Sequence, residues 1–300
     1  MSFRSLEINI PSELHIHHHV LEIQQEDQIL HIPIDDCNVI IASGPDVRLS
    51  ANDLSVLADS DVLFMTIDNH YLPSSMTLSF ANNVRQARTM KKQLTMSRRR
   101  RNNLWDQLIC AKIRNQSAVL YLLQRDGSQE IYDYAGRVNR GDRDHIEALA
   151  ANRYFQYYHP GLNRRCDDPV NSCLNYGYTI LRSAVARSAA AHGFLLSEGI
   201  FHHNTFNSFN LVDDLIEPFR PIADLQSAYI VSNQVRLSRE QRRKLMGILY
   251  LETRINGEIN TVLQAIDIMV NSVKSYIYSE TDEILVPELL PINEKGGISE

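Results

Sequence analysis

Up to about Phe80, apolar and polar residues alternate in short runs that predict β-strands. The alternation is clearest at Leu6, Ile8 and Ile10, where every second side chain is apolar, as in a strand with one buried face. Further strands are predicted at 21–23 and 29–34, as a hairpin around residues 25–28, and at 38–41 and 62–67. A short helix, capped by Ser50 and running through Leu54 and Leu57, is expected between the last two strands.

From Leu104 onward the period of the apolar residues becomes helical. Leu104, Leu108 and Ala111 recur at the spacing of one helix face. Asp168-Pro169 predicts an N-cap followed by proline in the first turn, with Gly193 as the stop, and Ser238 with Gln241 forms a capping-box pattern. One long apolar stripe follows at Ile259, Val262, Leu263, Ile266, Met269, Val270, Val273 and Ile277.

The change of period predicts an α+β protein, a small N-terminal β domain followed by a larger all-α domain. The expected divisions are an N-terminal domain at 1–84, a basic linker at 85–103, a helical domain at 104–290 and a tail at 291–300. The chain has 300 residues, enough for a sizeable core in each of two domains.

The composition indicates an ordinary globular protein, with 44% apolar residues. The chain has no run of eighteen apolar residues, so no membrane span is predicted. The N-terminus lacks the apolar region of a signal peptide. The four cysteines (Cys37, Cys110, Cys166 and Cys173) form no CxxC pair, so we expect reduced, buried thiols in a cytoplasmic protein.

The net charge of −6 does not suggest a nucleic-acid-binding protein, but the basic residues are unevenly distributed. Eight of them and no acid lie between Arg85 and Arg101, including the run Arg98, Arg99, Arg100 and Arg101. The segment is either a solvated linker or a contact to a phosphate backbone. A second basic group, at Arg236, Arg239, Arg242, Arg243 and Lys244, favours the phosphate contact.

Two segments about fifty residues apart place polar groups in apolar, helical surroundings. Glu147 is predicted on a helix that begins near Asp142 or Asp144, with small residues on its face; the alternative is a surface glutamate. The second segment, 199–221, contains His202 and His203 and then three acids. An unpaired charge in such a setting costs several kcal/mol, and a shared divalent cation would satisfy the groups together.

The three acids of the second segment lie at helical spacing. Asn210 is expected to cap a helix in which Asp213 and Asp214 lie four and three residues before Glu217, close enough to share one ion. Glu217 precedes Pro218, so this helix should kink or end there.

Two further groups have both a structural and a functional interpretation. Asn171, Asn175, Tyr178 and Arg182 form a polar stripe on the helix after Asp168; they are amides satisfied between helices or groups that orient phosphates. The histidines at 15 and 17–19 are interpreted as a solvent-facing patch rather than a metal site.

With these motifs, the chain resembles the CRISPR-associated integrase of the spacer-acquisition machinery, in the form that accompanies type II systems. The resemblance covers most of the chain. It rests on four ordered segments: Leu104-Trp105 with Lys112-Ile113-Arg114-Asn115-Gln116; Gly141-Asp142 with Glu147-Ala148-Leu149-Ala150-Ala151 and Tyr154-Phe155; Asp168-Pro169-Val170-Asn171 with Leu174-Asn175-Tyr176-Gly177-Tyr178; and Gly199 to Pro221.

The resemblance implies a β-sandwich-like N-terminal domain and a helical catalytic domain that holds a metal triad. The triad falls on Glu147, His202 and Glu217, with Asp214 as a second choice of ligand. His203 adjoins His202, which ranks first because it fits the Gly-x-x-His register. Such oxygen and imidazole ligands suit Mg²⁺ or Mn²⁺. Arg98 to Arg101, Asn175 and Tyr178 are the candidate DNA contacts.

The activity implied is metal-dependent integration, in which the 3′-hydroxyl of a short captured DNA fragment attacks a phosphodiester at the edge of a repeat. With water instead, the same site would be a weak nuclease. The implied partners are double-stranded DNA, a second copy of the chain and a small ferredoxin-like protein. Two alternatives from the residues alone are a metal-dependent phosphoesterase of a small substrate and a non-catalytic nucleic-acid scaffold.

Overall fold

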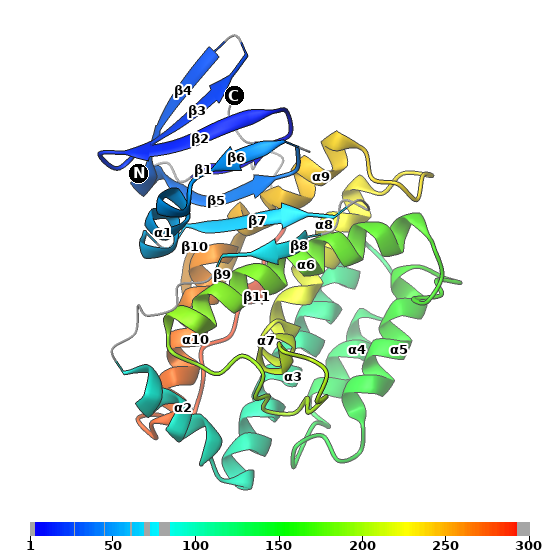
Figure 1. The fold of residues 1–300 in the computed structure, drawn as a ribbon. Coiled ribbons are helices and arrows are strands. Elements are labelled where there is room, and N and C mark those ends of the chain that lie inside the picture. Colours follow the sequence, from blue (N-terminus) through cyan, green and yellow to red (C-terminus); the bar gives the residue numbers. More distant parts are fainter. Residues whose placement is uncertain are drawn as a thin grey trace. The chain divides into compact units, whose positions relative to one another are not determined.

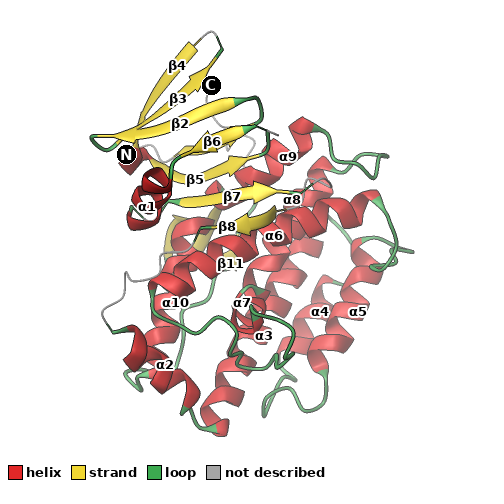
Figure 2. Cartoon of the chain, in the orientation of Figure 1, coloured by secondary structure: helices red, strands yellow, loops and turns green. Residues whose placement is uncertain are grey.

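The computed structural model describes residues 4–26, 28–44, 46–60, 62–68, 73–77 and 85–292. The chain divides into two compact units, Met1–Val84 and Arg85–Glu300 (Figures 1 and 2). The first contains mostly strands and the second mostly helices, so the predicted α+β class is confirmed.

The first unit contains two four-stranded sheets. One has the order β1-β5-β7-β8 and the other β4-β3-β2-β6. The elements are β1 (Arg4–Ile8), β2 (Ser12–His17), β3 (Val20–Gln25), β4 (Gln28–Pro33), a 3₁₀ turn (Ile34–Asp36), β5 (Cys37–Ala42), β6 (Val47–Leu49), α1 (Ala51–Asp59), β7 (Leu63–Ile67) and β8 (Pro73–Met76). Both sheets contribute to one core, with Leu14, Leu21 and Ile23 from one sheet and Ile40 and Phe64 from the other. The unit is therefore a β-sandwich.

The predicted hairpin is present, because β3 and β4 pair antiparallel with Leu21 opposite Ile32. The helix α1 is capped as expected: Ser50 accepts a hydrogen bond from the Asp53 N–H, and the Asp53 carboxylate accepts one from the Ser50 N–H. The strand β2 was not predicted, although its side chains alternate. It buries Leu14 and Ile16 and turns the histidines at 15 and 17 toward solvent.

The helices of the second unit surround one apolar core. They are α2 (Gln86–Leu94), α3 (Arg98–Leu122), α4 (Ser128–Ala135), α5 (Ile146–Tyr158), α6 (Pro169–Ala191), α7 (Asn210–Leu215), α8 (Arg220–Ile230), α9 (Arg239–Met246) and α10 (Val262–Ile277), with 3₁₀ turns at Glu217–Phe219 and Gly247–Tyr250. The helix α3 packs against α4, α5 and α8, while α6 packs against α8, α9 and α10. Asp168 caps α6 by accepting the Val170 N–H, as predicted.

The prediction that this unit is wholly helical was wrong. It includes a sheet of order β10-β9-β11, formed by β9 (Glu252–Ile255), β10 (Glu258–Thr261) and β11 (Glu288–Leu289). Ile259 belongs to β10 and is 59% exposed, rather than part of the buried stripe of α10. Asn256 and Gly257, both with positive φ, form the two-residue hairpin turn, and Thr261 then starts α10 with a capping box.

The segment 85–103 is also not a linker in this structure. Most of it is helical, in α2 and the first turns of α3, because Ser97 caps α3 by accepting the Arg100 N–H. The tail expected at 291–300 lies largely outside the described residues.

All four cysteines are free thiols, but only Cys37 and Cys173 are buried; Cys166 is exposed, contrary to the prediction. Among the helices that the structure describes, none combines the length and apolar character needed to cross a bilayer.

Candidate catalytic site

Glu147 lies in the first turn of α5, in a position fixed by the loop before it. The Asp142 carboxylate accepts hydrogen bonds from the Ile146 N–H at 2.8 Å and the Glu147 N–H at 3.1 Å. Asp142 thus satisfies two of the N–H groups that a helix start leaves without partners. Its own backbone N–H and that of Gly141 donate to Asp106 of α3. These bonds hold the start of α5 against α3.

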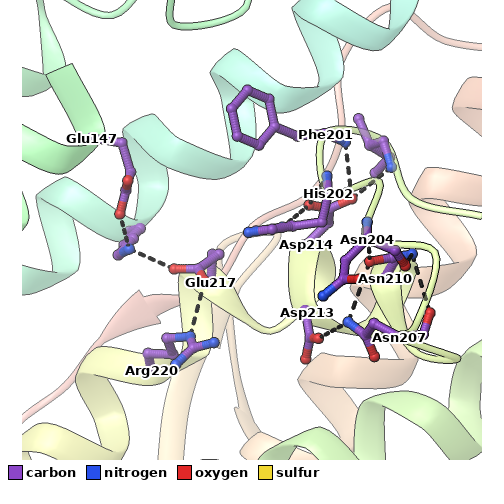
Figure 3. Close-up of polar contacts among 12 residues, drawn as sticks. Glu147, Phe201, His202, Asn204, Asn207, Asn210, Asp213, Asp214, Glu217 and Arg220 are labelled. Atoms are coloured by element: carbon purple, nitrogen blue, oxygen red, sulfur yellow. Dashed lines mark hydrogen bonds and ion pairs between the residues drawn. The ribbon is translucent and has the colours of Figure 1, made fainter. Parts of the chain in front are cut away.

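His202 lies on the loop before α7 and is oriented by a buried acid. The Asp214 Oδ1 atom lies 2.6 Å from His202 Nδ1, and the Asp214 carboxylate also accepts the backbone N–H groups of Ile200, Phe201 and His202. Asp214 has no exposed surface. Figure 3 shows the imidazole extending from Asp214 toward Glu217. The Asp214 hydrogen bond raises the pKa of His202, although burial opposes this.

One contact with α3 and one glycine within the loop fix the path of the same loop. Phe201 stacks on Trp105 of α3, with ring centroids 4.4 Å apart. A Cβ atom at Gly199 would lie 2.1 Å from the His202 carbonyl oxygen and 2.9 Å from Asp214 Oδ2. No larger residue fits there without moving the loop, which gives the Gly-x-x-His spacing a steric reason.

Glu217 begins the 3₁₀ turn after α7, where Pro218 prevents the helix from continuing. The predicted kink before this proline is therefore present. Asn115 of α3 fixes the turn by donating to the Pro218 carbonyl oxygen at 2.9 Å. Arg220 Nε lies 3.0 Å from Glu217 Oε1. Burial raises the pKa of Glu217, but Arg220 and Lys112 more than offset this, so its pKa lies below the ordinary value.

Lys112 of α3 joins the two glutamates. Its Nζ atom lies 2.5 Å from Glu147 Oε1 and 2.6 Å from Glu217 Oε2. The Lys112 and Glu217 side chains are only 9% and 8% exposed, and that of Glu147 is 28% exposed. The two carboxylates are therefore brought together around one ammonium group. The sequence had not indicated a role for Lys112.

The two carboxylates and the imidazole are donors that suit a hard divalent cation. Their side chains are, however, not arranged around a common point. Within the described ranges, no three His, Cys, Asp or Glu side chains are grouped so that they could hold a metal ion. The Lys112 ammonium group lies between two of the expected ligands, Glu147 and Glu217. Glu217 Oε2 is buried and pairs with Lys112 Nζ at 2.6 Å, so it is a charged carboxylate oxygen. Such an oxygen is a suitable ligand for Mg²⁺ or Mn²⁺.

The other two acids of this segment, Asp213 and Asp214, have different partners. Asp213 pairs with Arg182 of α6, with Oδ1 2.6 Å from Nε, and accepts a hydrogen bond from Asn207. Four donors already surround the Asp214 carboxylate, which orients His202; its role as a second-choice metal ligand stays a prediction. Asn210 does not cap α7, whose N-cap is Phe209; its amide donates to three loop carbonyl groups instead.

The candidate DNA contacts Asn175 and Tyr178 differ in accessibility. Asn175 is exposed and accepts a hydrogen bond from Arg164. The Tyr178 hydroxyl instead donates to Asp224 Oδ1 at 2.5 Å, and Tyr154 donates to Oδ2 at 3.0 Å. Burial is the main reason that the pKa of Asp224 rises from 3.8 to about 6, although the two tyrosines oppose the rise. Tyr178 is thus a structural residue in this network.

Substitution of Asp224 by asparagine should change how stability depends on pH. The folded protein binds the Asp224 proton more tightly than the unfolded chain, so this group's contribution to stability falls as pH rises from about 4 to 6. Relative to the wild type, Asp224→Asn should gain about 3 kcal/mol in unfolding free energy between pH 4 and 7. Urea unfolding of both proteins across this range measures the difference. A difference that does not vary with pH would contradict the raised pKa.

The four arginines at the start of α3 also divide into two pairs. Arg100 pairs with Asp282 at 2.7 Å and lies 4.1 Å from the centre of the Tyr276 ring. Arg101 pairs with Glu198 at 3.3 Å. Arg98 and Arg99 are exposed, and their side chains make no ion pair or hydrogen bond with the described residues. Of the four arginines predicted to contact DNA, Arg98 and Arg99 have free side chains within the described residues, whereas Arg100 and Arg101 form ion pairs within the fold.

The second basic group is mixed in the same way. Arg242 is buried and donates to the Leu237 carbonyl oxygen, and Lys244 pairs with Glu240 at 2.8 Å. Arg239 and Arg243 remain exposed on α9.

Comparisons with known proteins place the chain among CRISPR-associated proteins. The family described as "CRISPR associated protein Cas1" matches residues 8–254. A CRISPR-associated endonuclease Cas1 from Neisseria meningitidis serogroup C (strain 8013) is 34% identical over 98% of this chain and 99% of its own length. The chain therefore belongs to the Cas1 family, which confirms the resemblance inferred from the motifs.

Solved structures show the same fold. A casposase bound to integration product superposes with a TM-score of 0.75 at 19% identity, over 94% of this chain and 92% of that one. A Cas6-RT-Cas1–Cas2 complex gives a TM-score of 0.70 at 18% identity, over 94% of this chain and 35% of that one. At these identities the comparison supports the fold alone.

Proposed function

We propose that this protein is a metal-dependent DNA integrase and endonuclease. It inserts short captured DNA fragments into a CRISPR array by attack of a 3′-hydroxyl on a phosphodiester. The observation that carries the proposal is the convergence of Glu147, Glu217 and Lys112, beside His202, in a chain of the Cas1 family. The N. meningitidis relative is named an endonuclease, and the structurally similar casposase is bound to an integration product.

Glu147, His202 and Glu217 would hold Mg²⁺ or Mn²⁺. The chemistry supplied by such a cation would be a lower pKa of the attacking hydroxyl and stabilisation of charge on the phosphate oxygens. The protein supplies the positions of its own groups. Asp214 fixes the ring of His202, while Asn115 and Arg220 fix Glu217. No covalent protein nucleophile takes part.

Lys112 keeps the two glutamates together without a cation. Two carboxylates this close, one of them buried, would repel each other, and one would take up a proton. With the ammonium between them, the pKa of Glu217 stays low, so the carboxylate remains charged and able to bind a cation. The exposed amide of Asn175 on α6 remains a candidate DNA contact.

Strand transfer of a labelled short duplex into supercoiled DNA tests the proposal directly. We expect Mn²⁺ or Mg²⁺ to support the reaction and a chelator to abolish it. Hydrolysis of small phosphodiesters without strand transfer would favour the phosphoesterase. DNA binding without either reaction would favour the non-catalytic scaffold.

We also propose that two copies of this chain form a homodimer and that the homodimer binds a small ferredoxin-like protein. This assembly would act in the cytoplasm. It is supported by the similarity to the Cas6-RT-Cas1–Cas2 complex and by the small size of the β unit. Light scattering at micromolar concentration should give the mass of two chains, and a single-chain mass would contradict the dimer. Integration of both fragment ends should require added partner protein, since the partner would set the distance between two active sites.

A further inference from the structure

A hollow of about 520 Å³ lies between the first turns of α3 and the loop before α5. Four of its seven lining residues are arginines: Arg98, Arg99, Arg140 and Arg143. The first two belong to α3, and the other two lie about forty residues later in the chain. No pattern along the chain indicates that these two pairs meet.

The arginines of the hollow are not used to stabilise the fold. All four are exposed, and no ion pair or side-chain hydrogen bond joins them to another described residue. They differ in this from Arg100 and Arg101, which pair with Asp282 and Glu198. Like charges gathered in this way repel one another unless an anion offsets them, so the hollow favours a negatively charged occupant.

The acid that lines the hollow does not neutralise it. Asp106 is half-buried, and its Oδ1 atom accepts the backbone N–H groups of Gly141 at 2.8 Å and Asp142 at 3.1 Å. Its carboxylate fixes the loop that carries Arg140 and Arg143. One negative charge against four positive ones leaves the lining strongly basic.

The backbone of this loop is fixed against α3. Asn102 donates to the Arg140 carbonyl oxygen at 3.3 Å. Gly141 has a φ of +76°, and a Cβ atom there would lie 2.6 Å from Asn102 Cγ. Arg140 itself adopts a φ of +52°, which is uncommon for a residue with a side chain. The surroundings therefore hold the Arg140 backbone in one position, which suits a binding loop whose path is set before a ligand arrives.

The same loop leads into the catalytic site. Asp142 follows Arg140 by two residues and caps α5 at Ile146 and Glu147. A ligand held by Arg140 and Arg143 is thus bound by the loop that positions Glu147.

We propose that this hollow binds the phosphodiester backbone of DNA, as a contact separate from the catalytic carboxylates. The proposal rests on the proposed function, which makes DNA the substrate. Guanidinium groups bind phosphates through paired hydrogen bonds, and a single small anion would leave most of the four arginines without a counter-charge. A strand with a phosphate at each nucleotide can offset several of them at once.

Two double variants test the hollow from its two sides: Arg98→Ala with Arg99→Ala, and Arg140→Ala with Arg143→Ala. Anisotropy of a labelled duplex, measured with EDTA present, gives the Kd at several salt concentrations. Each double variant should raise the Kd by a similar factor for DNA duplexes of unrelated sequence. Each should also flatten the slope of log affinity against log salt by about 1.8 for duplex DNA, or about 1.4 for a single strand, if both arginines contact phosphates.

The matched control is Lys91→Ala with Lys92→Ala. It removes the same charge from exposed positions on the neighbouring α2, outside the hollow. The control should leave the salt dependence close to that of the wild type. A control that flattens the slope as much as the arginine variants would mean a diffuse charge effect and overturn the site. Unchanged slopes in both arginine variants would also overturn it, as would competition by polyglutamate equal to that by DNA.

Kinetics separate this site from the proposed function. In strand transfer, the arginine variants should raise KM for DNA and leave kcat near the wild-type value, whereas Glu147→Gln should lose kcat and retain DNA affinity. If the wild type shows no strand transfer but the arginine variants lose DNA binding, the proposed function fails while the hollow stands. If strand transfer is present and the variants bind DNA normally, only the hollow fails.

Discussion

Glu147→Gln should reduce strand transfer by about a thousandfold or more, because it removes one of the charged oxygen ligands expected to hold the cation. His202→Ala and Glu217→Ala should have losses of the same size. Purified variants assayed with Mn²⁺ give the rates, and circular dichroism checks that each protein is folded. Near-normal activity of Glu147→Gln would contradict the assignment of the metal site.

His203→Ala is the matched control for His202→Ala. Its position is adjacent and exposed, but Asp214 orients only His202. The control should therefore keep most of the activity. Asp214→Ala should lie between the control and the ligand variants, since the ring of His202 remains but is no longer held. A larger loss from His203→Ala than from His202→Ala would mean that the ligand is the second histidine.

Lys112→Met should lower the stability of the metal-free protein by about 3–5 kcal/mol. The reason is that the buried Glu217 carboxylate and the partly buried Glu147 carboxylate lose the ammonium between them. Added Mn²⁺ should then raise the unfolding temperature of the variant more than that of the wild type, because a cation would replace the missing charge. Calorimetry with EDTA and with Mn²⁺ measures both effects, without reference to activity.

Arg114→Met is the control for this experiment. Arg114 lies two residues further along α3, is exposed, and belongs to no ion pair with Glu147 or Glu217. It should change neither the metal-free stability nor the response to Mn²⁺ by a comparable amount. Equal Mn²⁺ responses in Lys112→Met and the wild type would show that the two glutamates do not share a cation.

Local patterns were sufficient where the determining interaction lies within a few residues. Ser50 caps α1, Asp168 caps α6 and Pro218 ends the helix before it, because each effect depends on backbone groups nearby in sequence. The four motifs, in their order along the chain, were also sufficient to identify the protein family. Local patterns did not predict β2 or the strand that contains Ile259. Whether such short segments form strands depends on the strands with which they pair.

The pairing of charged side chains could not be predicted in this way. Three acids lie within five residues at 213–217, at spacings that all permit a shared ion. The structure assigns Asp213 to Arg182, Asp214 to the His202 loop and Glu217 to Lys112. These partners come from different segments, so the choice depends on how the helices are rotated against one another.

The sequence by itself determined the α+β class, several helix ends, the Cas1 family and the residues at which chemistry was expected. Tertiary structure alone decided that Lys112 lies between Glu147 and Glu217, and that Arg98 and Arg99 meet Arg140 and Arg143. Helix caps and hydrophobic periodicity depend on residues only a few positions apart, so they can be read from a short segment of sequence. Ion pairs and basic surfaces are set by groups 35 to 105 residues apart, whose distances only the packed fold fixes.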